Sequence, residues 1–362
     1  MPPLVTIDDL HGALSRRRFL ADATRRQFLI GGLSLAALLA ACGSDDETPA
    51  SSGSGDDRFP VTIDHRYGST EIPAEPKRVV TVGLVEQDAL LAFGVVPVAT
   101  TQWFGEQPGA IFPWTREELG NAAVPEVLNE SDGIQFERIA ALRPDLILAL
   151  HSGITQADHD RLRRIAPTVA QPTGYIDYGV PWQDLTRTVA VAVGRAEQGE
   201  QLIAEIGARF ADVRADHPEF ARATILASGP AEGENYGVNA SEDPRSRIFT
   251  DLGFVVPAEI DELAGDQYYA EISIERVDLL DTDVLVWTLD SQGQRGEIQS
   301  NSLYAGLDVV TQSRDISLVN GTDVYDASNF VTVLSLPLLL DRLVPMLAAA
   351  VDGNPTTAVV PR

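Results

Sequence analysis

Residues 137–150 are repeated at 275–287, and this internal repeat constrains the possible folds more than any other feature of the sequence. In both copies a Glu-Arg pair is followed by a Leu, then an Asp three residues later, then a run of apolar residues. The matching positions are 138 residues apart: Glu137 and Glu275, Arg138 and Arg276, Leu142 and Leu280, and Asp145 and Asp283. Each copy is typical of a short helix that leads into a buried strand. We therefore expect two similar α/β lobes.

The pattern upstream of each copy is also repeated. The run Gly-Val-Val-Pro at 94–97 has a counterpart, Gly-Phe-Val-Val-Pro, at 253–257. Apolar runs predict strands at 79–82, 95–98, 145–150, 224–227 and 283–287, and helical spacing predicts helices at 86–93, 247–252 and, despite Pro337 and Pro345, 334–351. This alternation of strands and helices is typical of Rossmann-like α/β lobes.

The two copies are separated by a segment with apolar residues at helical spacing and a break at Gly194. A helix over 196–215 would be about 30 Å long, which is the width of a small domain. Such a rod would limit how far the lobes can swing. The expected organisation is an N-terminal lobe at 58–181, linking helices at 182–216 and a C-terminal lobe at 217–362.

The N-terminal 57 residues predict export and lipidation. Arg25-Arg26 precede an uncharged stretch at 28–41, which is too short to span a bilayer and is typical of a signal peptide. The arginine pair resembles a Tat signal, as does a second one at 16–18. Small residues before Cys42, the only cysteine, resemble a lipobox. We expect a signal peptide at 1–41, then a lipid on Cys42 and a disordered linker at 42–57, which together hold the protein on the outer face of the cytoplasmic membrane.

Composition and missing motifs exclude several classes of protein. The chain has 27 Lys+Arg against 53 Asp+Glu, and its formal charge of −26 disfavours nucleic acid as a partner. One Cys and five His disfavour a resident metal site. The sequence contains no Gly-x-Ser-x-Gly, no Gly-x-Gly-x-x-Gly and no His-Glu-x-x-His, and Lys77 is its only lysine. We therefore expect a protein that is not an enzyme and has no cofactor.

The region from Arg58 to Leu347 resembles the class III periplasmic-type substrate-binding proteins that deliver iron-siderophores or cobalamin to ABC importers. The stretches that carry the resemblance are PVTIDH at 60–65, IPAEPKRVV at 72–80, FERIAALRPDLI at 136–147, IAPT at 165–168 and YAGL at 304–307. The resemblance implies two lobes joined by one long helix, with a ligand cleft between them. It also implies a partner, the permease of an ABC importer. We expect a monomer.

The repeated glutamates have two interpretations. The resemblance implies that Glu137 and Glu275 form salt bridges with permease arginines, and two separated charges would fix orientation as well as attraction. Alternatively, each Glu only occupies the first turn of a helix, where it favours the macrodipole by about 0.3–1 kcal/mol. The two interpretations are compatible.

Loops that follow the strands are the expected ligand site, because ligands bind beyond the carboxyl ends of strands in open α/β sheets. A ferric siderophore is coordinatively saturated, so the protein needs aromatic faces and Arg donors rather than metal ligands. The candidate ligand-binding residues are Trp103, Phe104, Trp114, His151, Tyr236, Arg245 and Arg247.

Several alternatives remain open for these residues and for the ligand. The Trp and Tyr residues could pack in the core, as Trp287 is expected to do. Arg247 could open a helix or pair with an acid, and His151 could ligate heme or be a solvated loop residue. Glu232, Glu234, Glu242 and Asp243 disfavour a strongly anionic catecholate, so a hydroxamate or mixed iron(III)-siderophore is favoured. Cobalamin, heme or a non-transport surface lipoprotein are the alternatives.

Overall fold

The computed structural model describes residues 58–128, 133–352, 354 and 357. The chain from residue 58 onward forms one compact unit. The predictions for the signal peptide, Cys42 and the linker lie outside the described residues. None of the helices described is both long and apolar enough to cross a bilayer.

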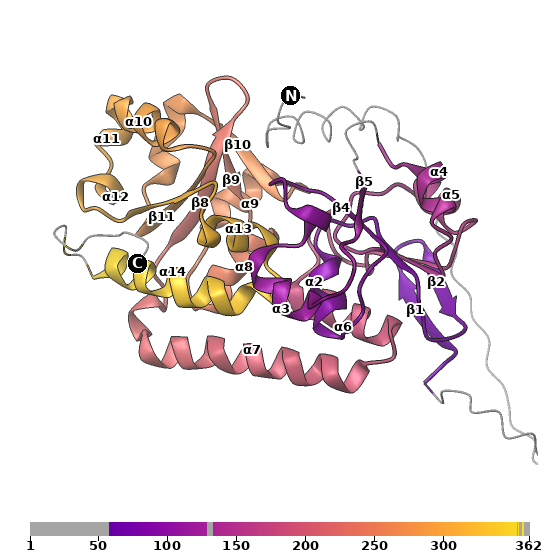
Figure 1. Cartoon of the computed structure of the whole chain (residues 1–362). Helices are drawn as coiled ribbons and strands as arrows, with labels where there is room; N and C mark the ends of the chain where they lie inside the picture. Colours follow the sequence, from indigo (N-terminus) through magenta and orange to yellow (C-terminus); the bar gives the residue numbers. More distant parts are fainter. Residues whose placement is uncertain (1–57, 129–132, 353, 355–356, 358–362) are drawn as a thin grey trace, which may run out of the picture. The chain divides into compact units, whose positions relative to one another are not determined.

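The N-terminal lobe is built on a five-stranded parallel sheet in the order β5-β4-β3-β6-β7 (Figure 1). Its strands are short, and all except the edge strand β5 are buried: β3 Val79–Thr81, β4 Ala99–Thr101, β5 Glu126–Leu128, β6 Leu146–Ala149 and β7 Thr168–Ala170. A hairpin of β1 (Val61–His65) and β2 (Gly68–Ile72) precedes the sheet. The lobe's helices are α2 Glu86–Ala92, α3 Arg116–Leu119, α4 Phe136–Ala141, α5 Gln156–Leu162 and α6 Trp182–Ala192, with 3₁₀ turns η1 Pro108–Ala110 and η2 Pro113–Thr115.

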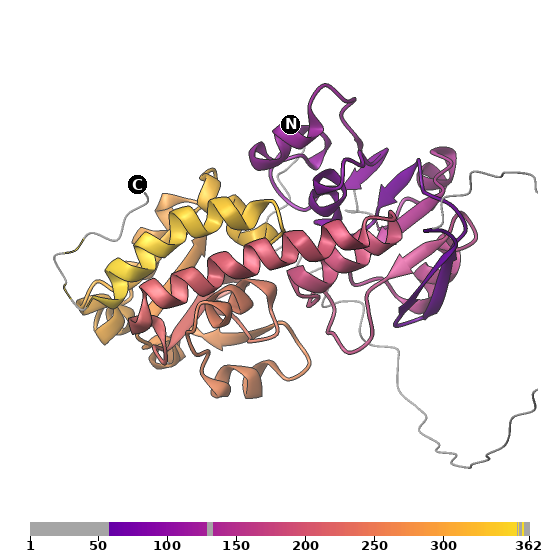
Figure 2. The same cartoon turned by 90° about the horizontal axis from the view of Figure 1, so that it is seen from below.

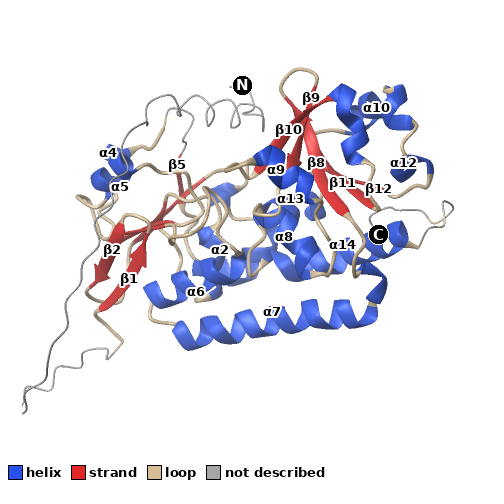
Figure 3. Cartoon of the chain, turned by 180° about the vertical axis from the view of Figure 1, so that it is seen from behind, coloured by secondary structure: helices blue, strands red, loops and turns tan. Residues whose placement is uncertain are grey.

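The C-terminal lobe has a second five-stranded sheet, in the order β10-β9-β8-β11-β12. Its strands are β8 Ile225–Ala231, β9 Asn235–Asn239, β10 Tyr269–Ser273, β11 Val284–Leu289 and β12 Asp315–Val319. Figure 3 shows this sheet and the surrounding helices, which are α8 Pro244–Asp251, α9 Ala258–Ala264, α10 Gln292–Ser300, α11 Ser302–Ala305, α12 Asp308–Thr311 and α13 Asp323–Phe330, with 3₁₀ helices η3 Pro218–Phe220 and η4 Ile274–Leu280. Trp287 is buried in the core of this lobe, as expected.

The repeated aspartates, Asp145 and Asp283, have the same structural role in the two lobes. Asp145 precedes β6 and accepts hydrogen bonds from the backbone N–H groups of Lys77 and Arg78, both at 2.8 Å. Asp283 precedes β11 and accepts from the backbone N–H of Thr224 at 2.8 Å. In each lobe the carboxylate therefore ties the start of one central strand to the start of its neighbour, which explains why this position is part of the repeat.

The two sheets differ at one edge. At this edge the structure also departs from what the apolar runs at 95–98 and 253–257 indicated. The run at 95–98 is not a strand, because Val95 N–H caps α2 by donating to Leu90 O at 2.9 Å and Pro97 has no N–H to donate. The strand β4 begins only at Ala99. In the C-terminal lobe the counterpart of this strand is reduced to a single parallel bridge, Thr224 with Val255. Its place is taken by β9 and β10, which run antiparallel.

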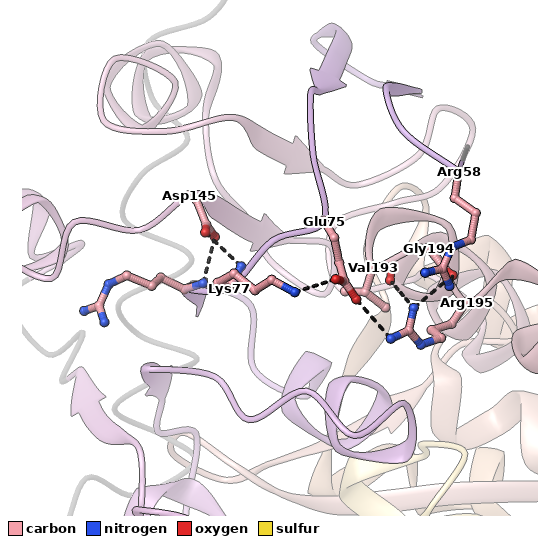
Figure 4. Close-up of polar contacts among 8 residues, drawn as sticks. Arg58, Glu75, Lys77, Asp145, Val193, Gly194 and Arg195 are labelled. Atoms are coloured by element: carbon pink, nitrogen blue, oxygen red, sulfur yellow. Dashed lines mark hydrogen bonds and ion pairs between the residues drawn. The ribbon is translucent and has the colours of Figure 1, made fainter. Parts of the chain in front are cut away.

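One long helix, α7, joins the lobes, and a second long helix packs against it. Helix α7 runs from Ala196 to Asp216, and Figures 1 and 2 show the final helix α14, Ser335–Val351, lying alongside it. The expected final helix is thus present and tolerates Pro345. The turn before α7 is tied to the N-terminal lobe by Glu75, whose carboxylate lies between Lys77 and Arg195 (Figure 4). The Arg195 Nη2 to Glu75 Oε1 distance is 3.0 Å.

The chain crosses back to the N-terminal lobe between α13 and α14. Phe330, the last residue of α13, packs in the same core cluster as Leu90, Phe112 and Leu148 of the N-terminal lobe. Two residues later, the Thr332 hydroxyl bonds the buried carboxylate of Asp88 on α2. The segment assigned by sequence to the C-terminal lobe alone therefore contributes to both.

Candidate ligand-binding site

Aromatic rings from both lobes meet at the carboxyl ends of their strands. Trp103 and Phe104 follow β4 in the N-terminal lobe and contact each other at 5.1 Å between ring centroids. From α13, Phe330 lies 6.1 Å from Trp103 and 5.6 Å from Phe104. Tyr325, one turn earlier on the same helix, lies 6.1 Å from Phe104. These contacts place two predicted ligand residues directly against the opposite lobe.

A second series of ring contacts also connects the two lobes. His151 follows β6, and its ring lies 6.1 Å from Trp103 and 5.6 Å from Tyr178. Tyr178 in turn lies 6.1 Å from Tyr268 of the C-terminal lobe. We give the name ring cluster to seven of these connected residues, Trp103, Phe104, His151, Tyr178, Tyr268, Tyr325 and Phe330; the rings of Phe112, Trp114 and Tyr269 also contact it.

Arg245 supplies a guanidinium beside this cluster. Its Nε and Nη2 donate to Asp243 Oδ1 and Oδ2 at 2.9 and 2.7 Å. Desolvation lowers the pKa of Arg245, but the Asp243 carboxylate more than offsets this and raises the pKa overall. The guanidinium interacts electrostatically with Tyr268, Tyr325 and, across the lobes, His151.

The tyrosine hydroxyls of the C-terminal lobe remain protonated at neutral pH. Burial raises the pKa of Tyr268 and of Tyr325 above the ordinary tyrosine value. The Tyr325 hydroxyl lies 3.5 Å from Asp290 Oδ1. Together with Arg245, these hydroxyls give the lobe junction several donors among its aromatic faces, which is the chemistry expected for an oxygen-rich ligand.

His151 is buried, with 6% exposure, so its interpretation as a solvated loop residue is wrong. Burial lowers its pKa to about 4, and the ring is neutral at physiological pH. The burial of His151 is explained by Glu86 on α2. The Oε1 atom of Glu86 accepts hydrogen bonds from the backbone N–H groups of Leu150 and His151 at 2.6 and 2.8 Å. This buried carboxylate holds the loop after β6 close to α2 and turns His151 inward.

Trp114 packs at the base of the ring cluster rather than within it. Its ring stacks on Phe112 at 4.9 Å, and its Nε1 donates to Asp88 Oδ2 at 2.8 Å. The same carboxylate oxygen accepts from the Thr332 hydroxyl. The polar atom of Trp114 is therefore used within the protein, although the ring lies 5.5 Å from Phe330.

Two other predicted residues are placed away from the cluster. Tyr236 lies on β9, is 5% exposed and packs edge-on against Trp287 at 5.1 Å, so the core-packing alternative describes it. Sequence reasoning placed it in a loop because the hairpin of β8 and β9 was not foreseen. Arg247 is in α8, forms an ion pair with Glu242 and lies 5.7 Å from the Tyr175 ring. Its pairing with an acid was one of the two alternatives expected.

Tyr178, Tyr268, Tyr325 and Phe330 were missed by sequence reasoning. Tyr178 and Tyr268 lie in loops that carry no strand signal, and α13 was not predicted. A dense set of aromatic residues in segments after apolar runs was the available signal. Only tertiary packing, however, brings Phe330 next to Trp103 from more than 200 positions away in the chain.

Glu137 and Glu275 occupy equivalent exposed positions in the two lobes. Each lies in the first turn of a helix, α4 or η4. The arginine that follows each is turned toward acids of its own lobe, Arg138 toward Glu126 and Arg276 toward Asp278. Within the described part of the chain, the two glutamates form no ion pair, and their carboxylates face solvent.

No group of three or more His, Cys, Asp or Glu side chains among the described residues is arranged to hold a metal ion. The site therefore consists of aromatic rings, hydroxyls and one paired guanidinium.

Comparison with known proteins identifies the family. A model of the family described as "Periplasmic binding protein" matches residues 88–317. The chain belongs to this family of solute-binding proteins, and its two lobes with a long joining helix have the class III architecture.

Individual relatives cover most of the ordered chain. A periplasmic solute binding protein from Mycobacterium smegmatis is 36% identical, with a TM-score of 0.72 over 80% of this chain and 98% of that one. PiaA from Streptococcus pneumoniae, solved in complex with ferrichrome, is 26% identical, with a TM-score of 0.71 over 81% of this chain and 99% of that one. The Fe(3+)-citrate-binding protein YfmC of Bacillus subtilis is 26% identical over 305 residues, 82% of this chain and 87% of that one.

Proposed function

We propose that this protein captures a ferric siderophore between its lobes and delivers it to an ABC importer. The observation that carries the proposal is the ring cluster, in which Trp103 and Phe104 of one lobe face Tyr325 and Phe330 of the other beside Arg245. Aromatic faces and N–H donors suit a complex whose iron is already fully coordinated. Within this site, Trp103, Phe104, His151 and Arg245 are the predicted residues that we assign to ligand contact.

The relatives support the same class of ligand. Two of the compared proteins, YfmC and PiaA, bind ferric citrate and ferrichrome, both of which enclose iron(III) in oxygen donors. We infer that the cargo, rather than the protein, supplies the iron coordination. Cobalamin and heme remain the alternative ligands.

Delivery requires a surface for the permease. We propose that Glu137 and Glu275 form that surface, because they are exposed, lie at matching positions of the two lobes and are left unpaired by their neighbouring arginines. A carboxylate on each lobe lets one partner contact both lobes at once.

We further propose that the protein is exported by the Tat route, is lipid-anchored through Cys42 outside the cytoplasm and acts as a monomer. The lipobox sequence before Cys42 supports the anchor, and two arginine pairs upstream support the export route.

The test of ligand binding is a titration of intrinsic Trp fluorescence with ferrichrome, ferric dicitrate, cobalamin and hemin. We expect saturable quenching by a ferric siderophore and an affinity at least about tenfold lower in Trp103→Ala, a loss of about 1.4 kcal/mol. Leu303→Ala, an exposed residue on α11, is the matched control and should bind as the wild type does. Binding of hemin or cobalamin alone, or of none of the four, would refute the proposal.

A further inference from the structure

The guanidinium of Arg245, which lies beside the ring cluster, is already paired with a carboxylate. Asp243 and Arg245 form a two-armed ion pair in which both carboxylate oxygens are used. Their side chains are only 3% and 16% exposed, so solvent screens the pair poorly. Asp243 is also the N-cap of α8, where its side chain accepts from the backbone N–H of Arg245 at 2.8 Å. The helix cap and the ion pair therefore fix the same carboxylate in place.

The other charged groups near the rings do not add a positive charge. Arg247, the second arginine of α8, lies away from the ring cluster, over the Tyr175 ring, and is paired with Glu242. His151 is neutral at physiological pH because burial lowers its pKa. Asp290 beside Tyr325 adds a carboxylate. The groups that the structure places around the ring cluster therefore sum to neutral or slightly negative.

This balance distinguishes between two kinds of iron(III) complex. Three singly charged hydroxamates balance the charge of iron(III), so a trishydroxamate such as ferrichrome is neutral. Citrate and catecholate complexes keep a net negative charge. An anion that leaves water for this junction loses its hydration without an unpaired cation to compensate, which is costly. A neutral complex loses less and gains the aromatic faces.

The Arg245 guanidinium still has unused donors for such a neutral ligand. Nε and Nη2 of Arg245 are bonded to Asp243, and within the described residues its Nη1 has no hydrogen-bond partner. Each of the two N–H groups on Nη1 can donate to a hydroxamate oxygen without requiring a full negative charge on the ligand.

We propose that the site selects neutral trishydroxamate complexes over anionic ferric citrate or catecholate complexes, and that Asp243 sets this selectivity by neutralising Arg245. This inference rests on the proposed function and names the ligand class within it. It separates this chain from the relative that binds ferric citrate and groups it with the one solved with ferrichrome.

The test compares two affinities in two variants. Calorimetry with ferrichrome and with ferric dicitrate should show tighter binding of ferrichrome by about tenfold or more in the wild type. Asp243→Asn keeps an N-cap acceptor but removes the charge that occupies Arg245. We expect it to shift the preference toward ferric dicitrate by about fivefold or more. Glu242→Gln removes an equal charge one residue earlier, from the pair with Arg247, and should leave the preference unchanged.

The possible failures are distinguishable. If neither ferric complex binds the wild type, the proposed function fails. If ferric dicitrate binds the wild type more tightly, the function stands and the selectivity claim is overturned. An unchanged preference in folded Asp243→Asn overturns the role of Asp243.

A second measurement covers the case in which Asp243→Asn does not fold, as judged by circular dichroism. Ferrichrome affinity in the wild type should change less than about twofold between low and high salt, because a neutral ligand carries no net charge for salt to screen. A strong decrease with salt would contradict the inference.

Discussion

Asp88 links the N-terminal lobe to the segment that returns between α13 and α14. It is fully buried on α2 and receives hydrogen bonds from Trp114 of the N-terminal lobe and Thr332 of the returning segment. Its second oxygen, Oδ1, has no hydrogen-bond partner among the residues that the structure describes. Desolvation outweighs the two hydrogen bonds and raises the pKa of Asp88 to about 7, with Glu118 contributing in the same direction. Burial with one oxygen unpaired therefore disfavours the charged form of Asp88, and the group is only partly ionised at neutral pH.

The raised pKa predicts how stability depends on pH. The native state keeps the Asp88 proton up to about pH 7, whereas the unfolded chain releases it near pH 4, so the stabilisation is complete below about pH 4 and is lost as pH rises to about 7. Asp88→Asn cannot titrate. We expect the free energy of unfolding of the wild type to fall relative to this variant by about 2–3 kcal/mol between pH 5 and pH 8.

Urea unfolding of both proteins at pH 5, 6, 7 and 8 measures this difference. The comparison cancels Asp326, whose pKa burial raises to about 6 and which titrates in both proteins. Parallel pH profiles would show that Asp88 does not change its protonation on folding.

The limits of sequence reasoning are clearest at single residues. Strand-end loops correctly indicated Trp103, Phe104 and Arg245 as residues of one region, because the carboxyl ends of parallel strands share an edge. The burial of His151 could not be predicted, because it depends on hydrogen bonds from its backbone to Glu86, 65 positions earlier. The neutralisation of Arg245 was likewise hidden, since adjacency in sequence to Asp243 does not specify a two-armed ion pair.

At the scale of elements, the turn between β3 and α2 holds the loop that carries His151 in place. Glu86 bonds the N–H groups of Leu150 and His151 through Oε1 and that of Val85 through Oε2. The carboxylate fills the space beside Gly83, where an added Cβ would lie 1.8 Å from Oε1. Glycine at this position is therefore required by the close approach of a side chain, and the turn, the helix and the loop after β6 depend on one another.

Gly83→Ala should disrupt this arrangement. The carboxylate would have to leave its buried N–H partners, at an expected cost of about 2–4 kcal/mol in unfolding free energy and with weaker ligand affinity because His151 is released. Gly207→Ala is the matched control, since a Cβ there meets nothing within 4 Å inside helix α7. It should raise stability by up to about 1 kcal/mol. Thermal unfolding and ligand titration of both variants test this, and an unperturbed Gly83→Ala would contradict it.

The repeat predicted the elements well where local pattern determines them. Strands β3, β6, β8 and β11 and the final helix lie where apolar runs predicted them. The β8–β9–β10 edge was not foreseen, because antiparallel pairing of these strands is decided by partners rather than by their own sequence. The return of Phe330 to the N-terminal lobe was missed for the same reason.

At the scale of the whole molecule, the doubled architecture places an exposed acid at the matching position of each lobe. Glu137 and Glu275 arise from matching positions, and each following arginine is paired within its own lobe. The acids are therefore available for a basic surface, whereas the large net charge of −26 makes other anionic surfaces repulsive.

Replacing both acids tests this surface. Glu137→Gln with Glu275→Gln should abolish siderophore-dependent iron uptake by cells while leaving ferrichrome affinity within about twofold of the wild type, because neither residue contacts the ring cluster. Glu205→Gln with Glu297→Gln changes two exposed acids on α7 and α10 and should support normal uptake. Uptake that persists in the first double variant would remove the docking assignment.

The central claim is that a ferric complex is held where the two lobes meet. Anomalous diffraction at the iron edge, from crystals of the protein grown with ferrichrome, locates the metal without assumptions about the ligand. We predict one iron position between the lobes, with the complex in contact with Trp103 and Arg245. An iron position elsewhere on the protein, or protein crystals without bound iron, would contradict the account.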